Sequence, residues 1–166
     1  MLLKPDVKLR GITDITVELL NKFDIKALLL DVDNTMSTHH GTVLTDGLLE
    51  WIDYMQLNGI KLMVLSNSKR KRIEPFAARI GLPFISLGLK PLPTGYLRGV
   101  KALGKKRENV AIVGDQIFTD VLGGNIVGVK TILLTPIKLE DGWSFKARRR
   151  LEKKIYKRYN IKDYEG

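Results

Sequence analysis

Short apolar runs alternate along the chain with longer stretches in which apolar and polar residues follow a helical period. The runs are rich in Leu, Ile and Val and nearly continuous in hydrophobicity. That pattern is typical of strands that are buried on both faces of a parallel sheet. We therefore expect strands at about residues 26–31, 60–66, 84–86, 109–115 and 130–135.

The stretches between these strands carry residues that commonly begin and end helices. Pro93 can open a helix that Gly104 ends, and Pro75 suits the first turn of a helix that runs to Arg79. Three further helices are expected at about residues 16–23, 46–59 and 118–126.

The order of these elements predicts the fold class. Strand and helix alternate repeatedly, which implies right-handed crossovers and an α/β three-layer sandwich. We expect a parallel, Rossmann-like sheet of about five strands. Residues 1–137 would form this domain, and residues 138–166 would form a basic helical extension packed on or near it.

Composition excludes several classes of protein. The chain of 166 residues suits one domain, and 44% hydrophobic with 28% charged residues is an ordinary globular composition. No apolar run approaches the roughly 20 residues needed to span a bilayer. Charged residues and Pro interrupt the start of the chain, so we do not expect it to be a signal peptide. Without cysteine, a disulfide framework and a cysteine-ligated zinc site are excluded. A cytoplasmic location is the expectation, with peripheral membrane association as an extension of it.

The positive charge is concentrated near the C-terminus. Residues 146–158 hold eight basic residues and one acid, within a chain of net charge +10. Such a block favours an anionic partner, either a membrane surface or nucleic acid, or else a well-solvated helix face. Apolar residues at every fourth position predict that one stripe of this helix packs on the domain. The stripe consists of Ala147, Leu151, Ile155 and Tyr159.

Polar residues gather where four of the predicted strands end, the edge at which parallel sheets bind ligands. They are Asp31, Asp33 and Thr35, then Ser66 and Asn67, then Lys90, and finally Asp115 and Asp120. Several carboxylates in one place repel each other, and a hard cation such as Mg²⁺, which prefers oxygen ligands, removes that repulsion.

These residue types suit the hydrolysis of a phosphate ester. One carboxylate can attack phosphorus, and a second can protonate the leaving oxygen and later activate water. Lys90 would balance charge on the phosphoryl group, and Ser66 would hydrogen-bond its oxygens.

The segments LLLDVDNT, VLSNS, GLKPLPTG and VGDQIFTDVLGGN, in this order, resemble the four motifs of the haloacid dehalogenase-like phosphatase superfamily. More narrowly, they are similar to its uncapped subclass IIIA and to the YqeG-type subfamily, relatives of mitochondrial phosphatidylglycerophosphate phosphatases. The resemblance covers about residues 20–136. It implies a Mg²⁺-dependent phosphomonoesterase with an aspartyl-phosphate intermediate, acting on a phosphorylated substrate such as a lipid head-group phosphate.

The resemblance also implies a role for each matching residue. Asp31 would be the nucleophile and a metal ligand, and Asp33 the general acid and base, with its backbone carbonyl on the metal. Asp115 would ligate the metal, and Asp120 would orient metal-bound water or the lysine. Phosphate binding would fall to Thr35, Ser66, Asn67 and Lys90, with Thr35 supporting the first motif's loop.

Spacing and missing motifs limit the alternatives. The segment after Thr35 is short, and residues 66–90 are already taken by one helix and one strand, so we expect no cap domain. No P-loop motif occurs, and two adjacent histidines, His39 and His40, lack a third partner for a metal site.

A phosphoacceptor receiver module also places Asp, Mg²⁺ and Lys at the ends of parallel strands. Its acceptor Asp follows the third strand, which here ends in Ser86 with no Asp, so the sequence argues against a receiver. The alternative that stays open is a phosphatase or an adaptor that holds nucleic acid or a ribosome through the basic tail.

Overall fold

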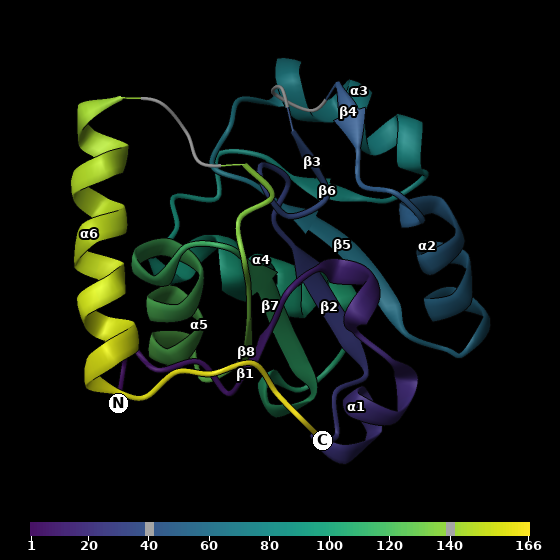
Figure 1. Ribbon diagram of the computed structural model, residues 1–166. Coiled ribbons are helices and arrows are strands. Elements are labelled where there is room, and N and C mark those ends of the chain that lie inside the picture. Colours follow the sequence, from purple (N-terminus) through teal and green to yellow (C-terminus); the bar gives the residue numbers. More distant parts are fainter. Residues whose placement is uncertain (39–41, 139–141) are drawn as a thin grey trace.

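A six-stranded parallel sheet forms the centre of the computed structural model, which describes residues 1–38, 42–138 and 142–166 (Figure 1). The strands are β1 (Val7–Leu9), β2 (Ala27–Leu30), β5 (Lys61–Leu65), β6 (Phe84–Ile85), β7 (Val110–Gly114) and β8 (Lys130–Leu134). Their spatial order is β1-β8-β7-β2-β5-β6. The predicted α/β class and parallel sheet are confirmed, and β2 lies in the interior of the sheet, paired with β5 and β7.

Helices cover both faces of the sheet and make the three layers. They are α1 (Val17–Lys22), α2 (Leu48–Leu57), α3 (Arg70–Ile80), α4 (Pro93–Leu103), α5 (Leu122–Val127) and α6 (Trp143–Arg158), with short turns η1 (Ile12–Asp14), η3 (Arg107–Asn109) and η4 (Ile117–Val121). Side chains of β2 alternate between two cores because successive residues of a strand face opposite sides. Leu28 and Leu30 join the core under α1, α2 and α3, whereas Ala27 and Leu29 join the core under α4.

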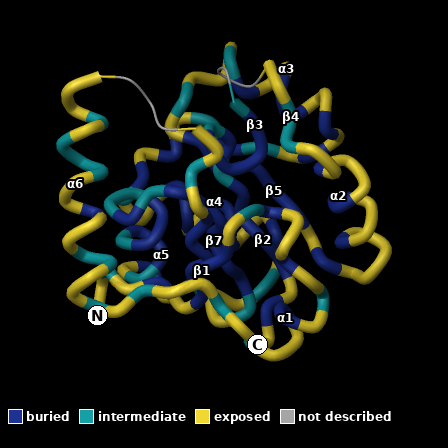
Figure 2. The backbone as a smooth tube through the Cα atoms, viewed as in Figure 1, coloured by how far each residue is buried: buried dark blue, intermediate teal, exposed yellow. Residues whose placement is uncertain are grey.

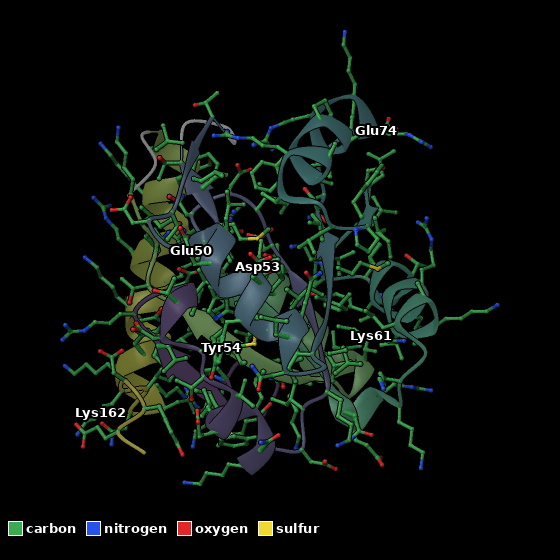
Figure 3. All side chains as sticks on the ribbon, turned by 90° about the vertical axis from the view of Figure 1, so that its right-hand side faces the viewer. Glu50, Asp53, Tyr54, Lys61, Glu74 and Lys162 are labelled. Atoms are coloured by element: carbon green, nitrogen blue, oxygen red, sulfur yellow. The ribbon has the colours of Figure 1, made fainter. Side chains whose placement is uncertain are left out.

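Contacts between neighbouring helices reinforce this packing. Val17 at the start of α1 donates its N–H to Tyr54 Oη of α2 at 3.2 Å, and Figure 3 labels Tyr54 beside the N-terminal segment. The indole of Trp51, also on α2, donates to the carbonyl of Ile15 at 2.9 Å.

The sixth strand, β1, was not predicted. It is three residues long, lies at one edge and pairs only with β8. Its central residue, Lys8, is buried, and its ammonium donates to Thr135 Oγ1 at 2.7 Å and Asp163 Oδ1 at 2.9 Å. A lysine at a buried position breaks the apolar run by which a strand is recognised.

Pro75 was expected in the first turn of its helix, and that expectation is wrong. Helix α3 begins five residues earlier, at Arg70, and Pro75 lies inside it. Proline costs the helix one backbone hydrogen bond. Buried Ile73, Phe76 and Ile80 on both sides of Pro75 hold the helix against the sheet, so packing outweighs that loss.

The described residues contain no cap domain, as expected. The regular structure of the described residues between β2 and α2 is a two-stranded antiparallel sheet, β3 (Ser37–Thr38) with β4 (Val43–Leu44). No helix among the described residues is long and apolar enough to cross a bilayer.

Helix α6 packs on the domain by a face that only partly matches the predicted stripe, because Ala147, Ile155 and Tyr159 are partly buried and Leu151 is not. Leu151, predicted to be buried, is exposed, whereas Glu152 is buried. Ile155 and Tyr156 contact the core of Ile117, Val121 and Leu133. Figure 2 shows exposed residues along much of the outer side of the helix. The apolar period of the sequence was misleading because ionic contacts, described below, orient the helix.

Gly95 on α4 allows this helix to approach the loop that follows β6. A Cβ at position 95 would lie 2.4 Å from the backbone oxygen of Gly88, a contact that backbone atoms cannot relieve by rotating. The loop around Gly88 leads directly to Lys90. Any displacement of α4 would therefore be transmitted to that lysine.

We predict that Gly95→Ala lowers the free energy of unfolding by about 1–3 kcal/mol, the usual cost of overpacking. In an uncrowded helix the same change would be stabilising. Urea denaturation followed by circular dichroism measures the effect. Arg98→Ala, at an exposed position of the same helix, is the control and should change stability by less than about 0.5 kcal/mol. Equal stability of Gly95→Ala and wild type would contradict the close approach.

Candidate active site

Asp31 and Lys90 meet at the carboxyl end of the central strand. Asp31 follows β2 directly, and its backbone N–H donates to the carbonyl of Val113 on β7 at 2.9 Å. Lys90 Nζ donates to Asp31 Oδ1 at 2.8 Å and to Asp120 Oδ1 at 2.8 Å. The lysine side chain is only 3% exposed, so these carboxylates replace its hydration.

The end of β7 contributes two more carboxylates. Asp115 follows the last residue of β7, and the π-helical turn η4 returns the chain so that Asp120 lies against the strand end. Asp120 Oδ2 accepts the N–H of Gln116 at 3.2 Å. Gly114 makes room, because a Cβ there would lie 2.1 Å from Asp120 Oδ2.

These acids form a cluster suited to a metal ion. Asp31, Asp115 and Asp120 each offer an oxygen, and the three oxygens lie within 4.8 Å of one another. Asp115 Oδ1 is buried and has no hydrogen-bond partner among the described residues. A buried carboxylate oxygen without a donor is costly unless a cation binds it. The donor set is all oxygen, which fits Mg²⁺.

The pKa values of the cluster reflect burial and mutual repulsion. Burial raises the pKa of Asp31 to about 6, although the nearby Lys90 lowers it. Burial and the charges of Asp31 and Asp120 raise the pKa of Asp115 well above its usual range, against the effect of Arg149. Burial lowers the pKa of Lys90, but the attraction of Asp120 and Asp31 outweighs it and raises that pKa overall. The site therefore holds the ammonium of Lys90 among carboxylates whose negative charges repel each other.

The loop before α4 is tied to the end of β5. Asn67 Nδ2 donates to the carbonyl of Lys90 at 3.1 Å, and the N–H of Lys90 donates to Asn67 Oδ1 at 2.7 Å. Ser66 is buried, and its hydroxyl accepts the N–H of Ser68 at 3.1 Å. The sequence-predicted residues of the second and third motifs thus lie in one hydrogen-bonded unit.

Asp33 is not part of the three-acid cluster and contacts Arg72 of α3. Arg72 Nη1 donates to Asp33 Oδ2 at 2.9 Å, and Arg72 Nη2 donates to Asp33 Oδ1. Arg72 Nη1 also donates to Ser68 Oγ at 2.6 Å. The Asp33 side chain is 41% exposed, so it remains accessible from solvent. Arg72 was not predicted, because the basic run after Ser66 places four cations near the site without showing which of them reaches Asp33.

Thr35 lies in the loop that follows Asp33 and is 1% exposed. Its N–H donates to the carbonyl of Val32 at 3.2 Å, which closes a tight turn. Its hydroxyl has no hydrogen-bond partner among the described residues. Thr35 therefore belongs to the turn that carries both Asp31 and Asp33.

The last helix supplies two ionic residues that the sequence analysis did not assign to the site. Arg149 Nη2 donates to Asp115 Oδ2 at 2.7 Å, and its Nη1 donates to the Asp115 carbonyl at 2.9 Å and to Glu152 Oε2 at 2.7 Å. Glu152 Oε1 accepts the N–H of Ile117 at 3.0 Å. Arg148 contacts Gln116 Oε1 at 3.0 Å. Arg148 and Arg149 thus face the domain. The basic block had also been compatible with a solvated helix face, and these two arginines are not part of one.

All the predicted site residues lie at one edge of the sheet, but the charged ones among them form two groups. Asp31, Asp115, Asp120 and Lys90 form the buried cluster, and Asp33 forms a separate ion pair. His39 and His40, which were not assigned to a metal site, lie outside the described residues.

Comparison with known proteins agrees with this geometry. A family model described as haloacid dehalogenase-like hydrolase matches residues 8–128. The probable phosphatase YqeG of Bacillus subtilis (strain 168) is 36% identical over 151 residues, which is 91% of this chain and 88% of the relative. The chloroplastic/mitochondrial phosphatidylglycerophosphate phosphatase 1 of Arabidopsis thaliana is 28% identical over 169 residues. That alignment covers 93% of this chain but only 47% of the relative, so this chain spans about half the length of the plant enzyme.

Solved structures share the fold at lower identity. An uncharacterized protein from Listeria monocytogenes serotype 4b aligns with a TM-score of 0.58 and 19% identity, covering 72% of this chain and 85% of that one. A subfamily III A hydrolase from Legionella pneumophila aligns with a TM-score of 0.54 and 17% identity, covering 79% of this chain and 74% of that one. The family model spans most of the chain, and the Bacillus relative is similar over nearly all of it, so the resemblance seen in the motifs is confirmed. The chain belongs to the haloacid dehalogenase-like hydrolases, as a phosphatase-type member.

Proposed function

We propose that this protein is a Mg²⁺-dependent phosphomonoesterase that forms an aspartyl-phosphate on Asp31. The observation that carries this proposal is the position of Asp31 at the centre of the buried cluster. Its carboxylate is held by Lys90 and has an oxygen within 4.8 Å of a carboxylate oxygen of Asp115, whose Oδ1 has no partner among the described residues. A nucleophile, a cation for the phosphoryl group and a metal-binding oxygen thus meet at one strand end.

The charge of the cluster supports a divalent ion. Asp31, Asp115, Asp120 and Glu152 face two cations, Lys90 and Arg149, which leaves two negative charges when all the groups are ionised. Asp31 and Asp115 side chains and the backbone carbonyl of Asp33 would hold the ion, with Asp120 behind them. The bound ion would polarise the phosphoryl oxygens and lower the charge repulsion between substrate and Asp31.

The first chemical step would be attack of an Asp31 carboxylate oxygen on phosphorus. A bond forms between Asp31 and phosphorus as the bond to the leaving oxygen breaks, and Asp33 gives that oxygen a proton. In the second step Asp33 takes a proton from water, whose oxygen attacks phosphorus. The bond to Asp31 breaks, inorganic phosphate leaves, and the carboxylate is restored.

Lys90, Ser66, Asn67 and Thr35 would complete the phosphate site. Lys90 carries the positive charge needed for the phosphoryl oxygens, and its contacts with Asp31 and Asp120 fix it before substrate arrives. Ser66 would donate its hydroxyl to a phosphoryl oxygen. Asn67 holds the backbone of Lys90, and the turn of Thr35 holds Asp31 and Asp33 at their spacing.

For the substrate we propose a lipid head-group phosphate such as that of phosphatidylglycerophosphate. The plant relative is named for this activity, and the lack of a cap domain among the described residues leaves room for a substrate presented by a large surface. The outer side of α6 adds exposed basic residues without an exposed acid: Lys146, Arg150, Lys153, Lys154, Lys157 and Arg158. These charges would favour a peripheral position on an anionic membrane, and nucleic acid is the competing partner.

Substitution of the two motif-one acids tests the chemistry. We predict that Asp31→Asn reduces turnover of a soluble aryl phosphate below detection, since an amide does not attack phosphorus. Asp33→Asn should lower kcat by about 10²–10⁴-fold, the usual contribution of general acid–base catalysis. Asp53→Asn, at an exposed position of α2 that Figure 3 labels, is the control and should keep full activity. Turnover that survives in Asp31→Asn would reject the nucleophile.

Metal dependence gives a second test. We predict that EDTA abolishes activity and Mg²⁺ restores it, whereas Zn²⁺ restores it poorly because the cluster offers no His or Cys. Asp115→Asn should raise the Mg²⁺ concentration for half-maximal activity by more than about tenfold, since even residues behind the ligands commonly contribute that much. Calorimetric titration of Mg²⁺ into wild type, Asp115→Asn and Asp53→Asn gives the affinity independently of turnover. Activity indifferent to chelation would contradict the metal site.

A substrate panel separates the lipid proposal from its alternatives. Phosphatidylglycerophosphate in mixed micelles should be hydrolysed with a kcat/KM at least about tenfold above that for sugar phosphates or nucleoside monophosphates, because the lipid adds binding contacts to the same reaction. Released inorganic phosphate is the readout for every compound. A clear preference for an oligonucleotide carrying a terminal phosphate would instead favour a nucleic-acid substrate.

A further inference from the structure

Three exposed leucines surround Lys90 at the carboxyl edge of the sheet. Leu87, Leu89 and Leu92 are 53%, 55% and 57% exposed, and we call them the leucine rim. They lie within six residues, between β6 and α4, and Lys90 between them points into the buried cluster. Single exposed leucines are common in proteins, but three within six residues beside a reacting centre call for an explanation.

The backbone holds the leucine rim in an unusual conformation. Leu87 and Leu89 have φ values of 48° and 55°, in the left-handed region that a leucine rarely adopts. Hydrogen bonds fix the loop there. Leu87 N donates to the carbonyl of Ser68 at 2.9 Å, and Gly88 N donates to the carbonyl of Ser66 at 2.8 Å. The exposed leucines are therefore carried by a loop that the end of β5 holds in place.

Basic residues border the leucine rim. Lys69, Arg70 and Lys71 are exposed at the start of α3, directly after the Ser68 carbonyl that binds Leu87. Segments 66–72 and 86–92 contain no acid, and of their five basic residues Lys90 is buried and Arg72 pairs with Asp33. Glu74 pairs with Arg70 on the exposed face of α3. Figure 3 labels Glu74 on this helix, at the top of the view.

We propose that the leucine rim and residues 69–71 dock the active-site edge onto a lipid bilayer that contains anionic lipids. Aliphatic side chains enter the acyl boundary and the basic residues contact the headgroups, as in other interfacial proteins. Nucleic acid would use the basic residues, but its bases stack on aromatic rings and not on leucine. Aliphatic and basic residues on one rigid edge therefore match a bilayer better.

The other side of the active site offers a second contact with the same surface. Trp143, 87% exposed, begins α6, which starts near the carboxyl edge of the sheet and runs back along it (Figure 1). In sheet order, β6 and its leucine rim lie at one end, and α6 packs against residues that follow β7 and against Leu133 of β8. Asp31, directly after β2, lies between them. A bilayer that touches both sides would face the carboxylate of Asp31. This inference rests on the proposed phosphatase function.

Flotation with vesicles tests the docking surface without any turnover. Wild-type protein should float with vesicles containing phosphatidylglycerol at low salt, and poorly with neutral phosphatidylcholine vesicles. Leu87→Asn/Leu89→Asn should reduce the partition coefficient about tenfold or more, given the transfer free energy of two leucine side chains. Asparagine tolerates the left-handed backbone, so the loop should keep its shape.

Matched controls use leucines and lysines at the opposite edge of the sheet. Leu2→Asn/Leu57→Asn changes two exposed leucines that precede β1 and β5, and should leave the partition coefficient unchanged. Lys69→Gln/Lys71→Gln should weaken binding to anionic vesicles and reduce its salt dependence, whereas Lys101→Gln/Lys106→Gln should not. Emission of Trp143 should shift to the blue when vesicles are added, since Trp51 is already buried.

The outcomes separate docking from catalysis. Leu87→Asn/Leu89→Asn should hydrolyse a soluble aryl phosphate like wild type, while losing vesicle binding. A wild type that ignores anionic vesicles at low salt, or a rim variant that floats as well as wild type, overturns the docking proposal even if phosphatase activity is present. Binding of RNA or DNA that excludes vesicles and ignores the leucine substitutions would also overturn it. Vesicle binding by Asp31→Asn, which lacks turnover, would support docking independently of the reaction.

Discussion

Repulsion among buried carboxylates is the constraint around which the carboxyl edge of this sheet is organised. Three aspartates from the ends of two neighbouring strands lie within a few ångströms of each other in a region largely closed to water. Lys90 relieves part of that repulsion from one side and Arg149 from the other. Each cation is in turn placed by secondary structure, Lys90 by the loop before α4 and Arg149 by α6. The neighbouring elements are therefore arranged to stabilise charges that the central strands bring together.

The residue with the most unusual environment in this arrangement is Asp115. One of its oxygens accepts from Arg149, and the other is buried without a donor among the described residues. Glu152 orients the guanidinium of Arg149 and also accepts the N–H of Ile117, at the start of η4. Helix α6 is thus joined to the turn that carries Asp120 as well as to Asp115. This linkage explains why the inward face of α6 carries ionic residues beside Ile155 and Tyr156, and why its apolar side chain Leu151 remains exposed.

Sequence reasoning recovered most of the sheet and the placement of the site because both follow from local rules. Apolar runs revealed five strands, and residues after parallel strands must meet at one edge. β1 was not predicted because Lys8 interrupts its short apolar run. The residues that bind the Lys8 ammonium, Thr135 and Asp163, are remote in the sequence. The start of α3 escaped because Pro75 suggested a helix beginning, whereas burial of Ile73 and Phe76 decides where that helix lies.

The sequence did not identify Arg72 and Arg149 as site residues, for a related reason. An arginine in a basic run looks like a solvated residue, and only the fold reveals which one faces a carboxylate. The contacts of Arg72 with Asp33 and of Arg149 with Asp115 join helices to strand ends across 39 and 34 residues of chain. No periodicity in either segment distinguishes these arginines from their basic neighbours.

The wide spacing of the site residues along the chain has a consequence for folding. Lys90 and Asp31 are 59 residues apart, and the contact of Lys138 with Asn34 joins residues 104 apart. Long-range contacts of this kind form late, because closing large loops costs conformational entropy before any contact repays it. A partly folded molecule with only its first strands in place would carry Asp31 without Lys90, Asp115 or Arg149. Asp31 therefore gains these partners only in the completed fold, and recovery of phosphatase activity would time the last stage of refolding.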